Sequence, residues 1–317
     1  MRDVIIIGGG LSGLAAAYQL EQYQIDYTLI EVKRRLGGSI HTVLQDGFVF
    51  DQGSFAVADT LDADWLAGLG LEESTYPLGE GVIAFQSGTG QIIEALAQKI
   101  HAPRLMRMAV SSIGELENGH CAVCLENGLL LEAKAIIVAL PARYAERLFY
   151  GYITPLTEAL LDYQYDTIQR VSLGFRSDDL PEKIQNPRDM AYAFIHRTDH
   201  SSRVPENHTM LQFGLRIAPQ RLESPEQAVT LLREVFDLPE PITQFVGYWA
   251  EADPISCYDD KHNQWVTDIR AQLPPQIALI GSDYSLNAPC HKGVAHLGDR
   301  IWQGQQAAQR LHENRKS

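Results

Sequence analysis

The glycine-rich turn at residues 8–13 constrains the fold of this chain more than any other feature. The segment VIIIGGGLSG joins an apolar run at residues 4–7 to a helical pattern at residues 12–24. In such a turn Gly8 permits the tight bend, Gly10 lets the backbone approach a pyrophosphate, and Gly13 lets the helix lie close to the strand. The first turn of the helix then offers unpaired N–H groups and a positive dipole end to an anion. The pattern predicts a strand, a phosphate-binding turn and a helix.

A second apolar run at residues 27–31 completes a βαβ unit and ends on an acid. Glu31 comes 23 positions after Gly8. At this point a carboxylate can accept hydrogen bonds from both hydroxyls of an adenosine ribose. A glycine-rich turn without a chemical role would not explain the acid, so we predict a dinucleotide site.

A second glycine pair, Gly37 and Gly38, follows this acid in the segment EVKRRLGGSIHT at residues 31–42. One glycine loop is enough to hold one pyrophosphate. The second pair therefore indicates which dinucleotide is bound.

The length and charge of the chain limit its organisation and its partners. A chain of 317 residues is long enough for two interleaved domains. Its formal net charge of -14 at pH 7 argues against a nucleic-acid partner, because a phosphate-binding surface needs a basic excess and residues 33–35 form only a short basic cluster. No apolar run approaches the length of a membrane span, so we expect no membrane insertion and a cytoplasmic location.

The four cysteines are too few for a disulfide framework and suit a reducing compartment. Cys121 and Cys124 have CxxC spacing within HCAVCLE, which has the pattern of a strand. Positions three apart in a strand point to opposite faces, so ordinary strand packing is favoured over a metal or redox site. We predict no metal ion.

The rest of the chain divides into two kinds of pattern. SGTGQIIEALAQKI predicts a helix entered through Gly88 and Gly90, followed by strands near residues 107–113, 121–126 and 135–140. QIALIGSDYS predicts a strand before a final helix at residues 299–314. From about residue 151 to 253, strands such as RVSLGFR and HTMLQFGLRI outnumber a single helix at SPEQAVTLLREVF, which predicts an antiparallel sheet with helices on one side.

Residues 31–42 resemble the segment after the second strand in the superfamily of FAD-dependent amine oxidases and protoporphyrinogen oxidases. In that superfamily an acid, basic residues, a glycine pair and a threonine wrap the phosphates of FAD and approach its ribityl chain. The arginine that amine oxidases usually carry after the glycine pair is Ser39 here, a departure from the amine oxidases that leaves the flavin resemblance intact. The matching residues are Glu31, Lys33, Gly37, Gly38 and Thr42.

The resemblance continues along most of the chain. DGFVFDQGSF resembles the strand and turn beside the flavin, GTGQIIEALA the second glycine-led helix, and VALPARY the strand and proline turn near the cofactor. Val110 stands where the backbone of the family pairs with the adenine. The terminal region is similar to protoporphyrinogen oxidases in particular, whose tryptophan, proline, histidine, glycine and acid recur in order as Trp249, Pro254, His262, Gly281 and Asp283.

The resemblance implies an α/β fold in which a Rossmann-like FAD-binding domain is interleaved with an α+β substrate domain built on an antiparallel sheet. We expect the FAD-binding domain at residues 1–55, 82–150 and 254–317, and the substrate domain at residues 56–81 and 151–253. Family members usually insert a long helical subdomain before the second glycine-led helix, but only residues 56–87 fill that gap here. The chain is therefore similar to the compact, renalase-sized members.

The resemblance also implies non-covalent FAD. Cys290 and His291 lie near the cofactor loop but match no known attachment site. The backbone of Leu297 or Gly298, with the positive end of the last helix, is expected at the N1 and O2 edge of the flavin. The residues expected to bind FAD are Gly8, Gly10, Leu11, Ser12, Gly13, Glu31, Val32, Lys33, Gly37, Gly38, Ser39, Gly53, Ser54, Phe55, Val110, Ala139, Leu140, Gly281, Ser282, Asp283, His296, Leu297 and Gly298.

Three residues are candidates for a direct part in catalysis. Tyr248 and Trp249 are expected to form an aromatic wall over the flavin, with core packing as the alternative. His296 is expected either to face the flavin ring or to have a structural role. Asp299 is interpreted as the N-cap of the last helix.

The expected function is that of an oxidase or dehydrogenase. It would remove a hydride from a small reduced substrate, such as an amine or a cyclic reduced compound, to flavin N5, and pass the electrons to O2 or another redox partner. A flavin-bound binding or assembly module without turnover is the alternative, because the substrate region is short. A nicotinamide-dependent flavin reductase is disfavoured because the sequence contains no second dinucleotide fingerprint.

Overall fold

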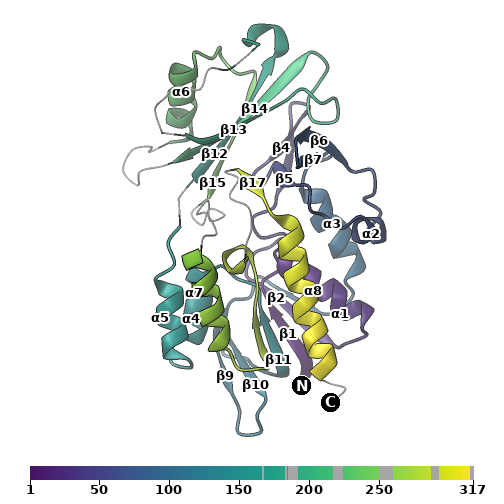
Figure 1. The fold of residues 1–317 in the computed structure, drawn as a ribbon, viewed down its shortest axis with the longest axis vertical. Coiled ribbons are helices and arrows are strands. Elements are labelled where there is room, and N and C mark those ends of the chain that lie inside the picture. The colour runs from purple at the N-terminus through teal and green to yellow at the C-terminus, as the bar shows by residue number, and fades with distance from the viewer. Residues whose placement is uncertain are drawn as a thin grey trace.

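The computed structural model describes residues 1–165, 168–182, 184, 192–216, 224–249, 260–286 and 293–314. Figure 1 shows a layered α/β half, which contains the first strands and the last helix, and a second half built on an antiparallel sheet. The predicted fold class is confirmed. The domain boundaries stay a prediction.

The main sheet of the layered half has the strand order β8-β2-β1-β11-β10-β9, and β16 pairs with β11. Strand β1 is parallel to both β2 and β11, and β16 is parallel to β11. The carboxyl ends of these four strands therefore meet at one edge of the sheet, which is where ligands bind in open α/β sheets. The strands are β1 (Arg2–Ile7), β2 (Tyr27–Glu31), β8 (Arg104–Met106), β9 (Val110–Glu115), β10 (Cys121–Leu125), β11 (Leu130–Val138) and β16 (Ile277–Leu279).

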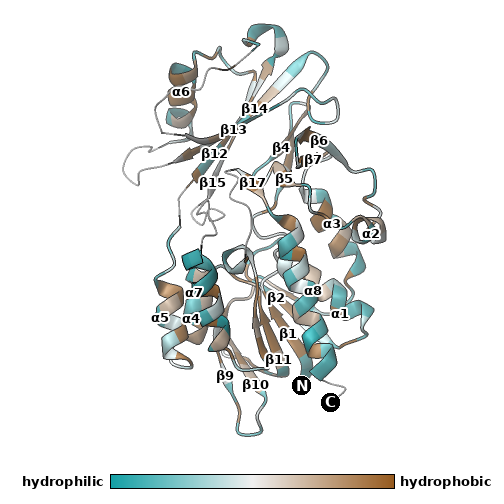
Figure 2. Cartoon of the chain, in the orientation of Figure 1, coloured by the Kyte–Doolittle hydropathy of each residue, from teal (hydrophilic) through white to brown (hydrophobic). Residues whose placement is uncertain are grey.

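Helices cover both faces of this sheet. Buried apolar residues of α1, α3 and α8 pack on one face, and those of α4, α5 and α7 pack on the other. Figure 2 shows the strands between them as the most hydrophobic part of this half, as expected for a parallel sheet buried on both sides. The helices are α1 (Leu11–Gln22), α3 (Gly90–Lys99), α4 (Ala142–Phe149), α5 (Thr154–Leu161), α7 (Asp260–Ala271) and α8 (Leu297–Asn314).

The second half contains a four-stranded antiparallel sheet of order β13-β14-β12-β15. Helix α6 (Pro225–Phe236) begins with a capping box, in which the Ser224 side chain and Gln227 bond reciprocally, and packs on one face of the sheet. This agrees with the predicted sheet with a helix on one side. The strands are β12 (Ile168–Arg176), β13 (Tyr192–Thr198), β14 (His208–Arg216) and β15 (Thr243–Trp249).

The short segment before α3 folds into more than the single helix expected. Helix α2 (Ala63–Gly68) is N-capped by the Asp62 side chain. Strands β5, β6 and β7, which flank this helix in the sequence, form a sheet with β17 in the order β17-β5-β7-β6. The hairpin β3-β4 precedes this sheet. The strands are β3 (Thr42–Gln45), β4 (Phe48–Asp51), β5 (Ala56–Ala58), β6 (Thr75–Gly79), β7 (Val82–Phe85) and β17 (Val294–Ala295).

A buried ion pair joins the two halves. The Arg203 guanidinium lies 2.8 Å from the Asp51 carboxylate, and both side chains are almost fully buried. Arg203 belongs to the connection between β13 and β14, whereas Asp51 ends β4 and accepts hydrogen bonds from Thr42 and from the N–H of Thr89, just before α3. One carboxylate thus ties the antiparallel half to the entry of the second glycine-led helix.

Two sequence-based expectations were wrong in detail. The strand predicted near residues 107–113 begins later, as β9 at Val110, because Arg107 has a positive φ of 58° that ends the preceding strand β8. Asp299 is not an N-cap, since α8 begins at Leu297 and Asp299 lies within its first turn.

The cysteines in the described residues behave as strand residues. Cys121 is buried and Cys124 is partly exposed in β10, and both are free. No group of residues in the described part of the chain has the arrangement of a metal site. In the same part, no helix combines the length and hydropathy needed to cross a membrane.

Candidate functional site

The turn between β1 and α1 is shaped by its glycines. Gly8 has a φ of 108°, its N–H donates to the Ile30 carbonyl, and a Cβ there would clash with the Ala139 carbonyl oxygen. A Cβ on Gly13 would clash with the carbonyl oxygen of Gly8. Gly10 precedes α1 without any side-chain cap, so the first N–H groups of the helix remain available to a ligand.

The second glycine pair packs directly against the first loop. Gly37 and Gly38 have φ angles of 102° and 58°, and the Gly37 N–H donates to the Gly9 carbonyl at 2.7 Å. A Cβ on Gly38 would lie 3.2 Å from the Cα of Gly10. The second pair is therefore needed for the close approach of two loops, whatever ligand lies beside them.

Glu31 links the same two loops through its carboxylate. The side chain is 6% exposed, and Oε2 accepts a hydrogen bond from the Gly9 N–H at 2.7 Å. Oε1 accepts one from the Lys33 N–H at 2.7 Å. Each carboxylate oxygen has a second lone pair, so these bonds leave acceptor capacity for ribose hydroxyls.

Arg35 braces the second loop and was not selected from the sequence. Its guanidinium donates to the carbonyls of Leu36, Gly38 and Ile40. Burial lowers the pKa of Arg35, and the nearby charge of Glu31 acts in the opposite direction. The side chain thereby holds the glycine pair in its positive-φ conformation.

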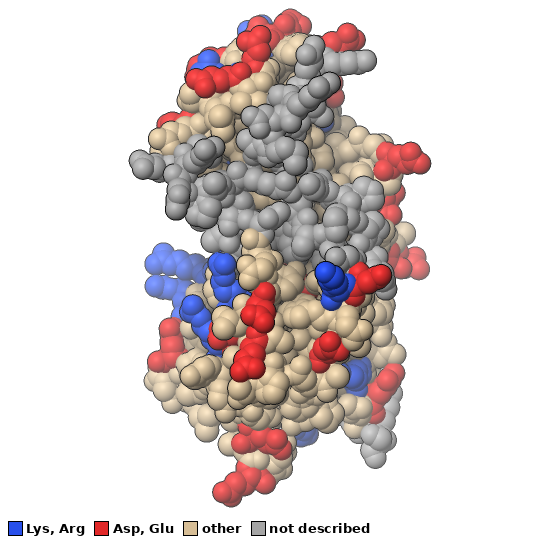
Figure 3. Space-filling model, turned by 60° about the vertical axis from the view of Figure 1, so that its left-hand side comes forward, with Lys and Arg blue, Asp and Glu red and all other residues tan. Residues whose placement is uncertain are grey.

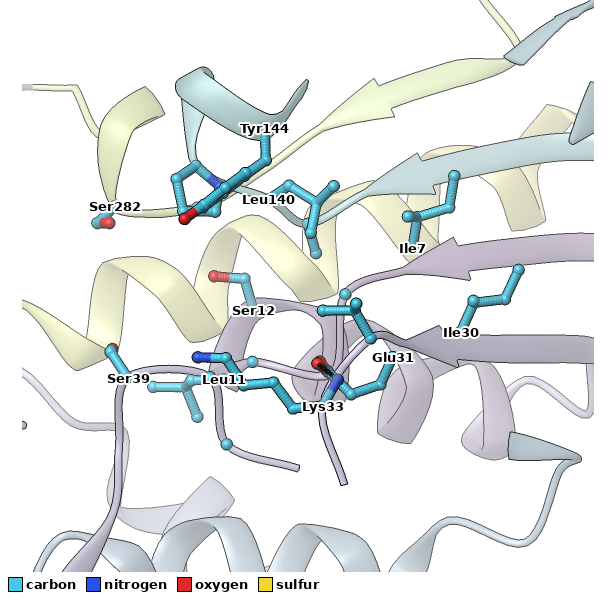
Figure 4. A pocket seen from close by; sticks show the side chains of 18 of the residues that line it. Ile7, Leu11, Ser12, Ile30, Glu31, Lys33, Ser39, Leu140, Tyr144 and Ser282 are labelled. Atoms are coloured by element: carbon cyan, nitrogen blue, oxygen red, sulfur yellow. Dashed lines mark hydrogen bonds between the residues drawn. The ribbon is translucent and has the colours of Figure 1, made fainter. Parts of the chain in front are cut away.

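A cavity of about 660 Å³ opens beside these loops at the carboxyl edge of the main sheet. This volume lies within the range of small-molecule and cofactor sites. In Figure 4, Tyr144 and Leu140 lie on one wall and Leu11, Ser12 and Lys33 on the opposite wall. The open helix end, the facing glycines and a cavity of this size fit a dinucleotide.

Most of the predicted FAD-binding residues meet at this cavity although they come from distant parts of the chain. They include the ends of β1, β2, β11 and β16 and the start of β9. The predicted residues that line it are Gly8, Gly10, Leu11, Ser12, Glu31, Val32, Lys33, Gly37, Gly38, Ser39, Val110, Ala139, Leu140, Gly281, Ser282 and Asp283.

Gly13 and the segment from Gly53 to Phe55 lie outside the lining. Gly53 packs against the backbone of Ser39, and its carbonyl accepts a hydrogen bond from Arg170. The Ser54 carbonyl accepts from the Thr89 hydroxyl, and the fully buried Phe55 ring faces Arg203. These residues therefore support the structure around the second loop and do not line the cavity.

The predicted residues of α8 also lie outside the lining. Leu297 is fully buried in the core, and Gly298 packs against the backbone of Thr60. His296 immediately precedes the helix and is partly buried. Their expected role at the flavin edge stays a prediction.

The two aromatic candidates end β15. In the strand register Tyr248 pairs with Gln169 and Trp249 with Ile168, so the two positions belong to opposite faces of the sheet. Their side chains lie outside the described residues, as do Pro254, Cys290 and His291.

Asp283 fixes the wall formed by α4. It is 2% exposed, and it accepts hydrogen bonds from the Ala142 N–H at the start of α4 and from the Tyr165 hydroxyl. Burial, with a smaller effect from the Asp283 charge, raises the pKa of Tyr165. The tyrosine therefore stays a neutral donor.

Several lining residues were not selected from the sequence, although Tyr144 ends the segment VALPARY that was expected near the cofactor. Tyr144, Arg147 and Leu148 come from one face of α4, where positions three and four apart are neighbours. Arg300 comes from the first turn of α8. Only tertiary packing brings these residues to the glycine loops. Arg35 differs from them, because the basic cluster beside Glu31 was a sequence signal for it.

Comparison with known proteins now decides the family. The model for flavin containing amine oxidoreductases matches residues 55–256, and that for an NAD(P)-binding Rossmann-like domain matches residues 6–67. The chain belongs to the flavin-containing amine oxidoreductase family. The resemblance inferred from the glycine loops and the FAD cofactor are thereby confirmed.

Curated members of the family match over short segments. Mitochondrial protoporphyrinogen oxidase of Nicotiana tabacum is 38% identical over 82 residues, which are 25% of this chain and 16% of that protein. Polyamine oxidase 5 of Oryza sativa subsp. japonica is 43% identical over 76 residues, 24% of this chain and 14% of that protein. The matched parts thus span about a sixth of these relatives.

Solved structures of amine oxidoreductases share the whole fold. A protein of Exiguobacterium sp. 255-15, provisionally named a protoporphyrinogen oxidase, has a TM-score of 0.75 at 16% identity, with 99% of both chains covered. A putrescine oxidase redesigned in cofactor binding has a TM-score of 0.75 at 14% identity, also with 99% of both chains covered. At such identities the likeness shows the fold alone.

Proposed function

We propose that this chain is an FAD-dependent oxidase or dehydrogenase that removes a hydride from a small reduced substrate. The observation that carries the proposal is the pair of interlocked glycine loops, which face an uncapped helix end at a cavity of about 660 Å³. Membership of a flavin-containing family supports it. When bound, FAD supplies a two-electron acceptor at N5.

The residues of the chain have distinct parts in this proposal. The N–H groups at the start of α1 hold the phosphates, Glu31 accepts hydrogen bonds from the adenosine ribose, and the Val110 backbone meets the adenine. The predicted positions at the start of α8, Leu297 and Gly298, direct N–H groups to the ring edge that gains negative charge on reduction. Trp249 or Tyr248 orients the substrate.

We propose amines and porphyrinogen-like reduced rings as the substrate classes to test first. The names of the relatives include polyamine oxidase and protoporphyrinogen oxidase, which support both classes. The electron acceptor is O2 or another redox partner. Substrate choice depends on the half of the molecule that carries β12 to β15.

The test begins with the cofactor and continues with its reduction. Acid precipitation of the purified full chain should release FAD into the supernatant, and chromatography separates it from FMN. The loaded protein is then mixed anaerobically with monoamines, polyamines and a porphyrinogen while the visible flavin absorbance is followed. Release of FMN, or no flavin at all, would refute the proposal.

A second candidate function is a flavin-bound binding or assembly module without turnover. The short substrate region favours it, because α2 contains only six residues between β5 and β6. This candidate predicts full FAD occupancy with no bleaching by any reductant in the panel. Bleaching by one substrate class, with saturation, would exclude it.

A further inference from the structure

The cavity wall contains a buried cation, Arg300, that no sequence motif selected. Arg300 is 7% exposed and lines the cavity from the first turn of α8. A guanidinium is costly to bury unless opposite charge or well-placed acceptors surround it. In the wall of a ligand site, this guanidinium is placed to meet an anionic ligand.

The charge of the cavity differs in sign from that of the chain. Among the described residues that line it there are four cationic side chains and two carboxylates, an excess of two positive charges, although the whole chain has a formal charge of -14. Figure 3 shows several basic side chains gathered on one side at mid-height, with acidic side chains next to them and elsewhere on this face. The charged lining residues are Lys33, Arg35, Arg147, Arg300, Glu31 and Asp283.

The packing of α8 on α1 places Arg300 in front of the open helix end. A Cβ on Gly304 would meet the Ser12 carbonyl oxygen, and the rings of Tyr23 and His312 stack at 4.4 Å beyond the other end of α1. The two helices therefore run in the same direction. Arg300 precedes Gly304 by four residues, about 6 Å along the axis, which places it beyond the first turn of α1.

A hydrogen-bond network fixes the turn that carries Arg300. The neighbouring Asp299 accepts hydrogen bonds from the Ser285 hydroxyl and, at 2.6 Å, from the Gln303 amide. The Gln303 side-chain oxygen accepts from the Gly281 N–H at 3.1 Å, and Gly281 itself lines the cavity. The first turn of α8 is thus held against the end of β16 in advance of ligand binding.

We propose that Arg300 binds the pyrophosphate of the cofactor, opposite the N–H groups of α1. This inference rests on the proposed function, because it takes a dinucleotide as the ligand. A pyrophosphate diester carries two negative charges, which match the two-charge excess of the cavity. Guanidinium and phosphate form charge-assisted, often bidentate hydrogen bonds, so Arg300 adds directional binding to the dipole of the helix.

The test uses ligands that differ only in their phosphates. The full chain, stripped of flavin, is titrated with adenosine, AMP, ADP and FAD by calorimetry, as parent and as Arg300→Gln. We expect Arg300→Gln to weaken ADP and FAD binding by roughly 10- to 100-fold, the range for a charged hydrogen bond, and to leave adenosine unchanged. Arg300→Lys keeps the positive charge but not the bidentate geometry of the guanidinium, so it should weaken ADP and FAD binding less than Arg300→Gln does.

The matched control is Lys261→Gln, which removes the same charge from an exposed position on α7 outside the cavity. It should leave all four affinities unchanged. Equal ADP binding by parent and Arg300→Gln would overturn the inference, as would an equal loss for adenosine and ADP. If Arg300→Gln does not fold, the affinities of Arg300→Lys test the inference instead. Parent-like ADP and FAD affinities in that variant would refute bidentate binding. FAD uptake by the parent chain is measured before any variant is tested, because a parent chain that takes up no FAD would refute the proposed function itself.

Discussion

At the scale of single residues, Glu31 has two tasks that the sequence showed only in part. Its position at the end of β2 predicted a ribose ligand, and this role stays a prediction. The structure adds that its two oxygens hold the N–H groups of Gly9 and Lys33. One carboxylate therefore shapes the loops that it is expected to serve.

Replacement of Glu31 by alanine should impair both tasks. Each charge-assisted bond contributes roughly 1.5–3 kcal/mol, so FAD occupancy after dialysis should fall sharply and the free energy of unfolding of the cofactor-free chain should also fall. Glu31→Gln keeps one oxygen acceptor, so its FAD occupancy and its free energy of unfolding should fall less than those of Glu31→Ala. Full flavin content in folded Glu31→Ala would contradict the ribose role.

His196 offers a pH test at the same scale. Burial, and to a smaller extent Arg170, lowers the pKa of His196 to about 4, and its Nε2 lies 3.2 Å from the Gly293 carbonyl oxygen. An unfolded chain takes up this proton near pH 6.5 and the folded chain only near pH 4. Unfolding therefore binds a proton in this window, and stability falls as the pH drops through it.

The variant His196→Gln should lack this component. Between pH 6.5 and pH 4 the parent should lose up to about 1.4 kcal/mol per pH unit more than the variant, measured by denaturant unfolding across the range. Parallel pH profiles for the two proteins would show that His196 is protonated in the fold.

At the scale of elements, the sequence predicted what local periodicity encodes. The first βαβ unit follows from one apolar pattern and one glycine turn, and helix α6 from the pattern of SPEQAVTLLREVF. Arg147 of α4 and Arg300 of α8 were missed, because they reach the cavity only through long-range packing. The sheet formed by β5, β6, β7 and β17 was missed because its strands are short and β17 comes from a distant segment.

The tight packing of the second glycine loop can be tested with one methyl group. In Gly37→Ala the positive φ of 102° is strained, and the Cβ would lie 2.7 Å from the Ile40 carbonyl oxygen. We expect a loss of FAD affinity and of stability well above the roughly 1–2 kcal/mol for left-handed backbone strain alone. The control is Gly70→Ala, which has a φ of 72° but open space around its Cβ. Similar losses in both variants would mean that loop packing contributes little.

At the scale of the whole molecule, the cavity draws on strands and helices from both ends of the chain. Residues from β1, β2, α4 and α8 and from the turns after β11 and β16 line it, so a bound dinucleotide contacts the folded arrangement and not any single segment. A ligand that binds only the folded state stabilises it by about 2.7 kcal/mol at a hundredfold excess over its dissociation constant.

FAD should therefore raise the thermal midpoint of the stripped chain in proportion to the logarithm of its concentration. FMN, which lacks the adenosine half, should have a much smaller effect at equal concentration. Differential scanning fluorimetry with both ligands measures the two shifts. An FMN shift as large as that of FAD would show that the adenosine half is not recognised.

The place of β16 beside β11 also has a consequence for biosynthesis. Strands β1, β2 and β11 are complete by residue 138, but their partner β16 and the turn of α8 that carries Arg300 come from residues 277–300. At 5–20 residues per second, a ribosome needs roughly 8–32 s to add the intervening segment. During that interval the glycine loops have been synthesised, but one wall of the cavity has not. We therefore expect the nascent chain to take up flavin only after the last helix has left the ribosome.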